Sequence, residues 1–141
     1  MKIVLDTNVF VSGVFFTGPP GRILDAWRDG RVKVAVSAAI LEEYHRVGSV
    51  LAERYEGVAL EPLLTLLAVN AEVVEAPELS ERVCEDPDDD KFLACALAAG
   101  SGVVVSGDKH LIRVSGWSGI EVLRPRQFCE QYLASRPKPG G

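Results

Sequence analysis

A chain of 141 residues with 48% hydrophobic residues suits one domain with a single core, and its formal net charge of −5 argues against nucleic-acid binding by bulk electrostatics alone. No apolar run approaches the roughly 20 residues of a membrane span, and no secretory leader is evident, so we expect a cytoplasmic protein. The three cysteines lack CxxC spacing, which argues against a disulfide framework or a zinc site and predicts free buried thiols at Cys84, Cys95 and Cys129.

Apolar runs that alternate with helical patterns predict strands separated by helices. The expected strands are 3–5, 32–36, 71–75, 103–105 and 120–123. The expected helices are 9–16, 22–29, one capped by Ser37 and reaching Leu51, 61–69, one from Asp86-Pro87 to Gly100, and 125–133. Residues 17–21 are expected to form a loop and 135–141 a frayed tail. This order predicts an α/β domain over residues 1–134, with a mostly parallel sheet and helices on both faces.

Acidic residues follow two of the predicted strands. Asp6 comes directly after the first strand, and Asp108 follows the fourth strand and Ser106-Gly107. Because open α/β sheets bind ligands at the carboxyl ends of their strands, we expect both acids at one edge. Two carboxylates there would repel each other unless a cation lay between them. Taken alone, Asp6 is also compatible with a turn-forming role, hydrogen-bonded to the following backbone.

Two further acids share the apolar face of a predicted helix. Glu43 lies three residues after Ile40 and four before Val47, whereas Asp90 precedes Leu97 by seven. A carboxylate on an apolar face needs a partner, which favours a role for both in the site.

Each helical acid also has a purely structural interpretation. Glu43 is compatible with an ion pair to Arg46 or Arg22. The acids of residues 86–90 are compatible with an N-cap at Asp86 and with a first turn that complements the helix dipole. That second interpretation leaves the apolar position of Asp90 unexplained.

Ligation by carboxylates alone selects hard cations such as Mg²⁺ or Mn²⁺, which keep bound waters and favour phosphate substrates. The chemistry that follows is phosphoryl transfer, in which one or two metal ions activate a water for in-line attack on phosphorus. The acids that would converge on such a site are Asp6, Glu43, Asp90 and Asp108.

The chain resembles the PIN domain, and particularly its VapC-like toxins, in four segments: IVLDTNVFVSG, VSAAILEEYHRV, EDPDDDKFLACALAAG and VVVSGDKHL. The resemblance covers about residues 2–130. It implies a three-layer fold with a parallel sheet of five strands, and a metal-dependent endoribonuclease that cleaves single-stranded or looped RNA. It also implies a homodimer and a small antitoxin partner.

By motif, the resemblance assigns catalytic and metal-binding roles to the four acids already named, Asp6, Glu43, Asp90 and Asp108. The run of acids at 88–90 leaves the third ligand open by one residue, with Asp89 as the reserve. Supporting roles, ordering Asp6 or a metal-bound water, fall to Asn8 and Ser106.

Charge is unevenly distributed along the chain. Residues 109–141 hold six basic and two acidic residues, whereas residues 72–90 hold nine acids and a single arginine. We therefore expect RNA contacts from the basic residues Lys109, Arg113, Arg124 and Arg126.

Other functions can be compared with the same residues. A calcium-binding loop starting at Asp86 fails because its sixth position is Lys91 rather than glycine, and a dinucleotide site fails because no glycines follow the first strand. A phosphoacceptor signalling domain is a distant alternative. The stronger one is a catalytically silent PIN-like module that binds RNA or protein without cutting.

Overall fold

Parallel strands form one five-stranded sheet of order β3-β2-β1-β4-β5 in the computed structural model, which describes residues 1–55 and 60–133. The strands are β1 (Lys2–Leu5), β2 (Lys33–Val36), β3 (Glu72–Val73), β4 (Val103–Val105) and β5 (Glu121–Leu123). Leu5 lies opposite Val105, which in turn lies opposite Leu123, so the carboxyl ends of these three strands share one edge. The predicted parallel sheet is confirmed.

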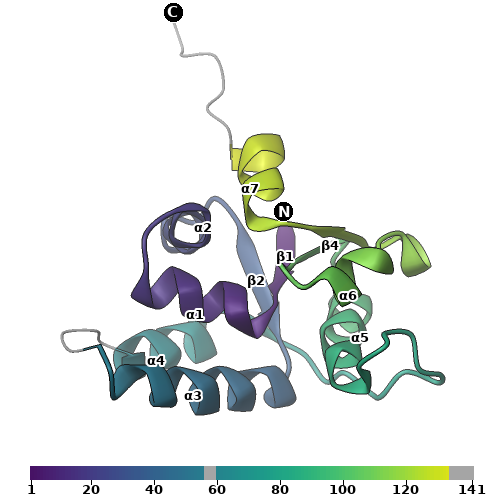
Figure 1. Ribbon diagram of the computed structural model, residues 1–141, viewed down its shortest axis with the longest axis horizontal. Coiled ribbons are helices and arrows are strands. Elements are labelled where there is room, and N and C mark those ends of the chain that lie inside the picture. Colours follow the sequence, from purple (N-terminus) through teal and green to yellow (C-terminus); the bar gives the residue numbers. More distant parts are fainter. Residues whose placement is uncertain (56–59, 134–141) are drawn as a thin grey trace, which may run out of the picture.

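Helices cover both faces of the sheet, as predicted (Figure 1). On one side lie α1 (Thr7–Phe15), α2 (Pro19–Arg28), α3 (Ala38–Ala52) and α4 (Leu60–Asn70). On the other side lie α5 (Asp90–Ala99) and the short α6 (Lys109–Arg113). The last helix, α7 (Pro125–Phe128), continues into a π-helical turn, Cys129–Leu133, and both pack against α2.

The two helical layers follow from the strand order. The chain moves outward from β1 through β2 to β3, and then returns across the sheet to β4 and β5. Because crossovers between parallel strands are right-handed, the reversal places the later helices on the opposite face. The reversal also creates a switch point between β1 and β4, where open α/β sheets commonly bind ligands.

The central strands are buried because both of their faces are covered. Ile3, Val4 and Leu5 have no exposed surface. From α3, the buried Tyr44 stacks on Phe10 with ring centroids 4.2 Å apart and donates its hydroxyl to the Leu5 carbonyl at 2.5 Å. This contact fixes α3 against the end of β1, beside the switch point.

Several element boundaries differ from the predictions. Helix α1 begins two residues early because the Asp6 side chain caps it, and α2 begins at Pro19, inside the predicted loop, because proline suits the first turn of a helix. Strand β3 is shorter than predicted because it is an edge strand, where Val73 remains exposed. Helix α6 and a 3₁₀ turn at Trp117–Gly119 were not predicted.

Other local predictions hold. Ser37 caps α3, and Gly100, with φ of 69°, ends α5 in the left-handed conformation that glycine favours. The three cysteines are free and buried. Among the described residues no helix combines the length and apolarity that crossing a membrane requires. The predicted tail at 135–141 lies outside the described residues.

Candidate active site

Asp6 is the first residue after β1 and the N-cap of α1. Its Oδ1 accepts the Asn8 backbone N–H at 3.1 Å, and its Oδ2 accepts the Ser106 hydroxyl at 2.5 Å. Burial raises the pKa of this carboxyl, which is 6% exposed; the two hydrogen bonds oppose the rise, and the charges of Asp108 and Glu43 add to it. The turn-forming role of Asp6 is therefore present together with a buried, crowded carboxylate.

Ser106 connects Asp6 to the loop after β4. The fully buried hydroxyl donates to Asp6 and accepts the Asp108 backbone N–H at 2.9 Å. The Asp108 carboxylate accepts the His110 backbone N–H at 2.8 Å and thereby caps α6. Both strand-end acids are consequently held in place by caps and by one shared serine.

Asp90 turns toward the loop that precedes α5. Its Oδ1 accepts the Cys84 backbone N–H at 2.7 Å, and its Oδ2 accepts the Val83 backbone N–H at 3.0 Å. Both carboxylate oxygens thus stabilise the loop that leads into α5. Leu97, expected on the same buried stripe as Asp90, is 51% exposed, so the predicted stripe was wrong at that position.

Asp89, the reserve candidate, lies with the acids of the switch point. A 3₁₀ turn at Pro87–Asp89 precedes α5, so α5 begins at Asp90 rather than at Asp86-Pro87 as predicted. Burial, followed by the charges of Asp108, Asp86 and Asp6, raises the pKa of Asp89 to about 7. The charges of Asp6 and Asp108 therefore act on Asp89, whereas both oxygens of Asp90 accept backbone N–H groups.

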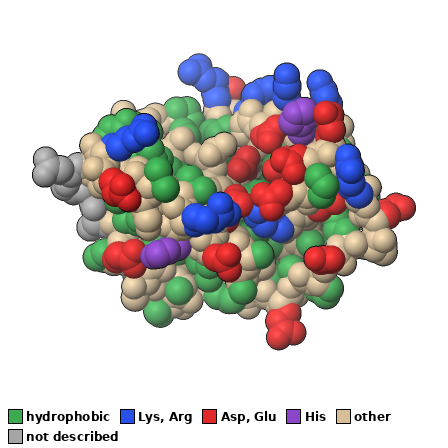
Figure 2. All heavy atoms as spheres, turned by 60° about the horizontal axis from the view of Figure 1, so that its bottom comes forward, with side chains coloured by type: hydrophobic (Ala, Val, Ile, Leu, Met, Phe, Trp, Pro, Cys, Tyr) green, Lys and Arg blue, Asp and Glu red, His purple; other side chains and the backbone are tan. Residues whose placement is uncertain are grey.

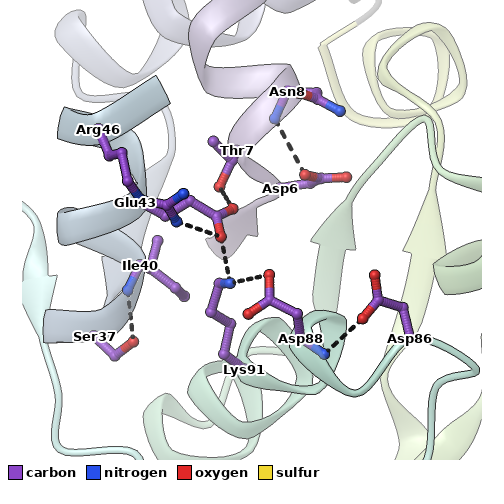
Figure 3. Close-up of polar contacts among 10 residues, drawn as sticks. All are labelled: Asp6, Thr7, Asn8, Ser37, Ile40, Glu43, Arg46, Asp86, Asp88 and Lys91. Atoms are coloured by element: carbon purple, nitrogen blue, oxygen red, sulfur yellow. Dashed lines mark hydrogen bonds and ion pairs between the residues drawn. The ribbon is translucent and has the colours of Figure 1, made fainter. Parts of the chain in front are cut away.

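Glu43 joins Asp6 from the side of α3, where it is surrounded by donors (Figure 3). Its Oε2 accepts the Thr7 hydroxyl, and its Oε1 accepts Lys91 Nζ at 2.5 Å. Of the two arginines considered from the sequence, Arg46 makes a contact, 3.6 Å from Oε1. Glu43 thus has both the ion pair and the position near Asp6 that the sequence suggested.

Thr7 and Lys91 are the site residues that sequence reasoning missed. Thr7 had a signal, because it lies between Asp6 and Asn8 in the Asp-Thr-Asn turn. Lys91 had only its spacing of three from Asp88, whose carboxylate it contacts at 2.8 Å. Its contact with Glu43 spans 48 residues of sequence, which no local pattern reveals.

The acids at the switch point between β1 and β4 have the donor chemistry of a divalent-cation site but not its arrangement. Within residues 1–55 and 60–133, no three His, Cys, Asp or Glu side chains are arranged to hold a metal ion as they lie. In the same part of the chain, Asp6, Asp89 and Asp108 take part in no ion pair. Their oxygens are the donors that Mg²⁺ prefers, and Mg²⁺ binds through one or two carboxylates while keeping several waters. The donor chemistry fits such an ion.

Positive charge surrounds these acids on the surface. Figure 2 shows acidic side chains gathered on this face with basic side chains beside them. The four basic residues chosen from the sequence are exposed. Arg124 reaches the Gly107 carbonyl at 3.4 Å, next to Asp108, whereas Arg113 lies 3.5 Å from Glu85. Arg124 is therefore the best placed of them to meet a ligand at the switch point.

In the absence of metal, we expect the free energy of unfolding to fall as pH rises from about 4 to about 7. Folded Asp89 keeps its proton up to a pKa of about 7, whereas its ordinary pKa is 3.8. The folded chain therefore binds more protons in this window, and raising the pH favours the unfolded chain. Urea unfolding in a chelator at several pH values measures this slope. Asp89→Asn should flatten it, and an unchanged slope would contradict the assignment.

Comparisons with known proteins agree with this architecture. A family model for the PIN domain matches residues 2–110. The uncharacterized protein MJ1680 of Methanocaldococcus jannaschii is 30% identical over 143 residues, covering 94% of this chain and 92% of that protein.

Two solved structures share the fold. VapBC2 from Rickettsia felis, in a crystal structure bound to a DNA fragment from its promoter, matches with a TM-score of 0.57 at 12% identity. FitAcB from Neisseria gonorrhoeae matches with a TM-score of 0.53 at 19% identity. Each match covers 88% of this chain and 98% of the other.

Proposed function

Because the chain belongs to the PIN-domain family, we propose that it is a Mg²⁺- or Mn²⁺-dependent endoribonuclease that cleaves single-stranded or looped RNA. The observation that carries this proposal is the gathering of Asp6, Asp89 and Asp108 at the switch point between β1 and β4, without a basic partner among the described residues. Burial raises the pKa values of Asp6 and Asp89, and carboxyl groups perturbed in this way are typical of functional sites.

In this proposal Asp6, Asp89 and Asp108 would hold the divalent ion, one or two of them directly and the rest through the waters that such an ion keeps. When bound, the ion would polarise the scissile phosphate and lower the pKa of an attacking water. Ser106 and the Asn8 backbone keep the Asp6 oxygens in a fixed direction. The supporting role of Asn8 thus falls to its backbone N–H.

The experiment that tests the proposal is RNA cleavage by the metal-stripped protein, with Mn²⁺ or with a chelator. We expect internal cuts in a diverse pool of single-stranded RNA only when the metal is present. Absence of cuts under all metal conditions would contradict the nuclease proposal. Binding of RNA without cleavage, unaffected by Asp6→Asn, would instead support the silent binding module.

A role as the toxin of a toxin–antitoxin pair in the cytoplasm is a further part of the proposal. It rests on the resemblance to VapC-like toxins and on the fold shared with VapBC2 and FitAcB. A small antitoxin that covers the site would then block cleavage.

Homodimerisation is proposed through exposed apolar side chains on α4, where Leu66 is 43% and Val69 75% exposed. Light scattering after size-exclusion chromatography measures the dimer.

We expect the exposed basic residues to guide RNA by neutralising phosphates. Replacing Lys109, Arg113, Arg124 and Arg126 by glutamine should lower the salt dependence of RNA binding, by about 0.7 in the log–log slope for each charge that contacts a phosphate. Fluorescence anisotropy across a salt series measures this slope. Arg28→Gln, an exposed charge on α2, is the matched control and should leave the slope unchanged. An equal slope in the fourfold variant would contradict RNA guidance.

A further inference from the structure

The carboxylates around the switch point fall into two groups that differ in how their charge is compensated. Asp6, Asp89 and Asp108 form no ion pair within the part of the chain that the structure describes. Glu43 and Asp88, by contrast, share the ammonium of Lys91, at 2.5 and 2.8 Å (Figure 3). Arg46 also lies 3.6 Å from Glu43 Oε1, so the two negative charges of the second group face two cations of the chain itself.

Lys91 is held firmly in this position. Its side chain is 17% exposed and that of Glu43 is 13% exposed, so water screens their contact little. Its Nζ donates to Glu43 Oε1 and to Asp88 Oδ2, one acid from α3 and one from the turn before α5. The ammonium is therefore fixed between two carboxylates from different elements.

Glu43 has no oxygen left without a donor. The Thr7 hydroxyl occupies Oε2, and Lys91 Nζ occupies Oε1 with Arg46 behind it. A divalent ion that bound a remaining lone pair of Glu43 would lie beside the ammonium. Since like charges at contact distance repel strongly in a partly buried site, this half of the site disfavours a metal ion.

We propose that Lys91 takes the place of a second metal ion, so that the site binds one divalent cation at Asp6, Asp89 and Asp108 while Glu43 is held by the lysine. This inference rests on the proposed function and settles its metal count. Lys91 acts on Glu43 rather than on the metal ligands, and is a positioning residue. It also leaves a fixed positive charge beside Glu43 that complements an RNA phosphate.

The test is the number of Mn²⁺ ions bound per chain, measured by isothermal titration calorimetry on the metal-stripped full chain. We expect one ion for the wild type and one for Lys91→Arg, which keeps the positive charge. Lys91→Met should bind two, because Glu43 and Asp88 lose their cation. Adding Glu43→Gln to Lys91→Met should restore a single ion. Lys33→Met, at an exposed position on β2, is the matched control and should bind one.

Electron paramagnetic resonance gives a second readout, because two adjacent Mn²⁺ ions couple magnetically and a single ion does not. We expect the coupled signal in Lys91→Met alone. Two ions in the wild type would overturn the inference and leave the nuclease proposal intact. A folded Lys91→Met protein that binds one ion would also overturn it. No binding of Mn²⁺ to the wild type, together with no cleavage, would refute the proposed function itself.

Discussion

Asp6→Asn is expected to lower the rate of metal-dependent RNA cleavage by on the order of a thousandfold, since metal activation contributes several kcal/mol to the transition state. Asp6 is the acid on which the site centres: it is buried, fixed by Ser106 and the Asn8 backbone, and influenced by the charges of both Asp108 and Glu43. Its neutral analogue keeps the shape of the side chain but removes the charge that a divalent ion needs.

The measurement is single-turnover cleavage of a labelled RNA with saturating Mn²⁺. Asp108→Asn should produce a comparable loss, because Asp108 follows the neighbouring strand β4 and its charge acts on Asp6. The matched control is Asp25→Asn on α2, whose side chain is 71% exposed and pairs only with Arg28 at 3.8 Å within the described residues. Cleavage by Asp6→Asn at the wild-type rate, in a protein that remains folded, would refute the assignment.

The second large effect separates two adjacent acids by opposite results. Asp89→Asn should abolish Mn²⁺ binding and cleavage, yet raise the stability of the metal-free protein above pH 7. A neutral side chain there no longer repels Asp108, Asp86 and Asp6, the charges that, with burial, hold the pKa of Asp89 at about 7. Replacement of Asp89 therefore removes both a proposed metal ligand and the charge that the neighbouring carboxylates repel.

Asp90→Asn should show the reverse pattern. Its carboxylate accepts the backbone N–H groups of Val83 and Cys84, and an amide has only one oxygen to offer them. We expect a loss of about 1.5–3 kcal/mol in the free energy of unfolding. Mn²⁺ affinity per folded molecule should stay near the wild-type value.

Urea unfolding and Mn²⁺ titration on both variants, at a temperature where both are folded, make the comparison. Each variant is the matched control for the other, because the two substitutions are chemically identical and adjacent in sequence. If Asp90→Asn loses the metal while Asp89→Asn keeps it, the third ligand is Asp90, as the motif first assigned it. The assignment of Asp89 would then be wrong.

Much of the fold could be predicted from the sequence because its signals are local. The β-branched runs at 3–5 and 103–105 form the buried central strands, and Ser37 and Gly100 bound helices through their own backbone preferences. Helix α6 escaped prediction because it is a single turn that depends on the Asp108 cap. A pattern of five residues is too short to show helical periodicity.

The site could be predicted in part for the same reason. Asp6 and Asp108 follow strands whose register the apolar runs already imply, so their shared edge follows from a parallel sheet. Glu43 was found by its position on an apolar helix face, which Tyr44 anchors by its hydrogen bond to Leu5. These three assignments needed only strand ends and helical spacing.

The sequence by itself thus determined the parallel sheet, the edge at which Asp6 and Asp108 meet, and the face from which Glu43 approaches. Only the tertiary structure shows that Asp90 binds backbone N–H groups, that the charges of Asp108 and Asp6 act on Asp89, and that Lys91 pairs with Glu43. The physical reason is the range of the interactions. Strand and helix patterns reflect neighbours a few residues apart, whereas the direction of a charged side chain depends on partners that packing brings together from distant parts of the chain.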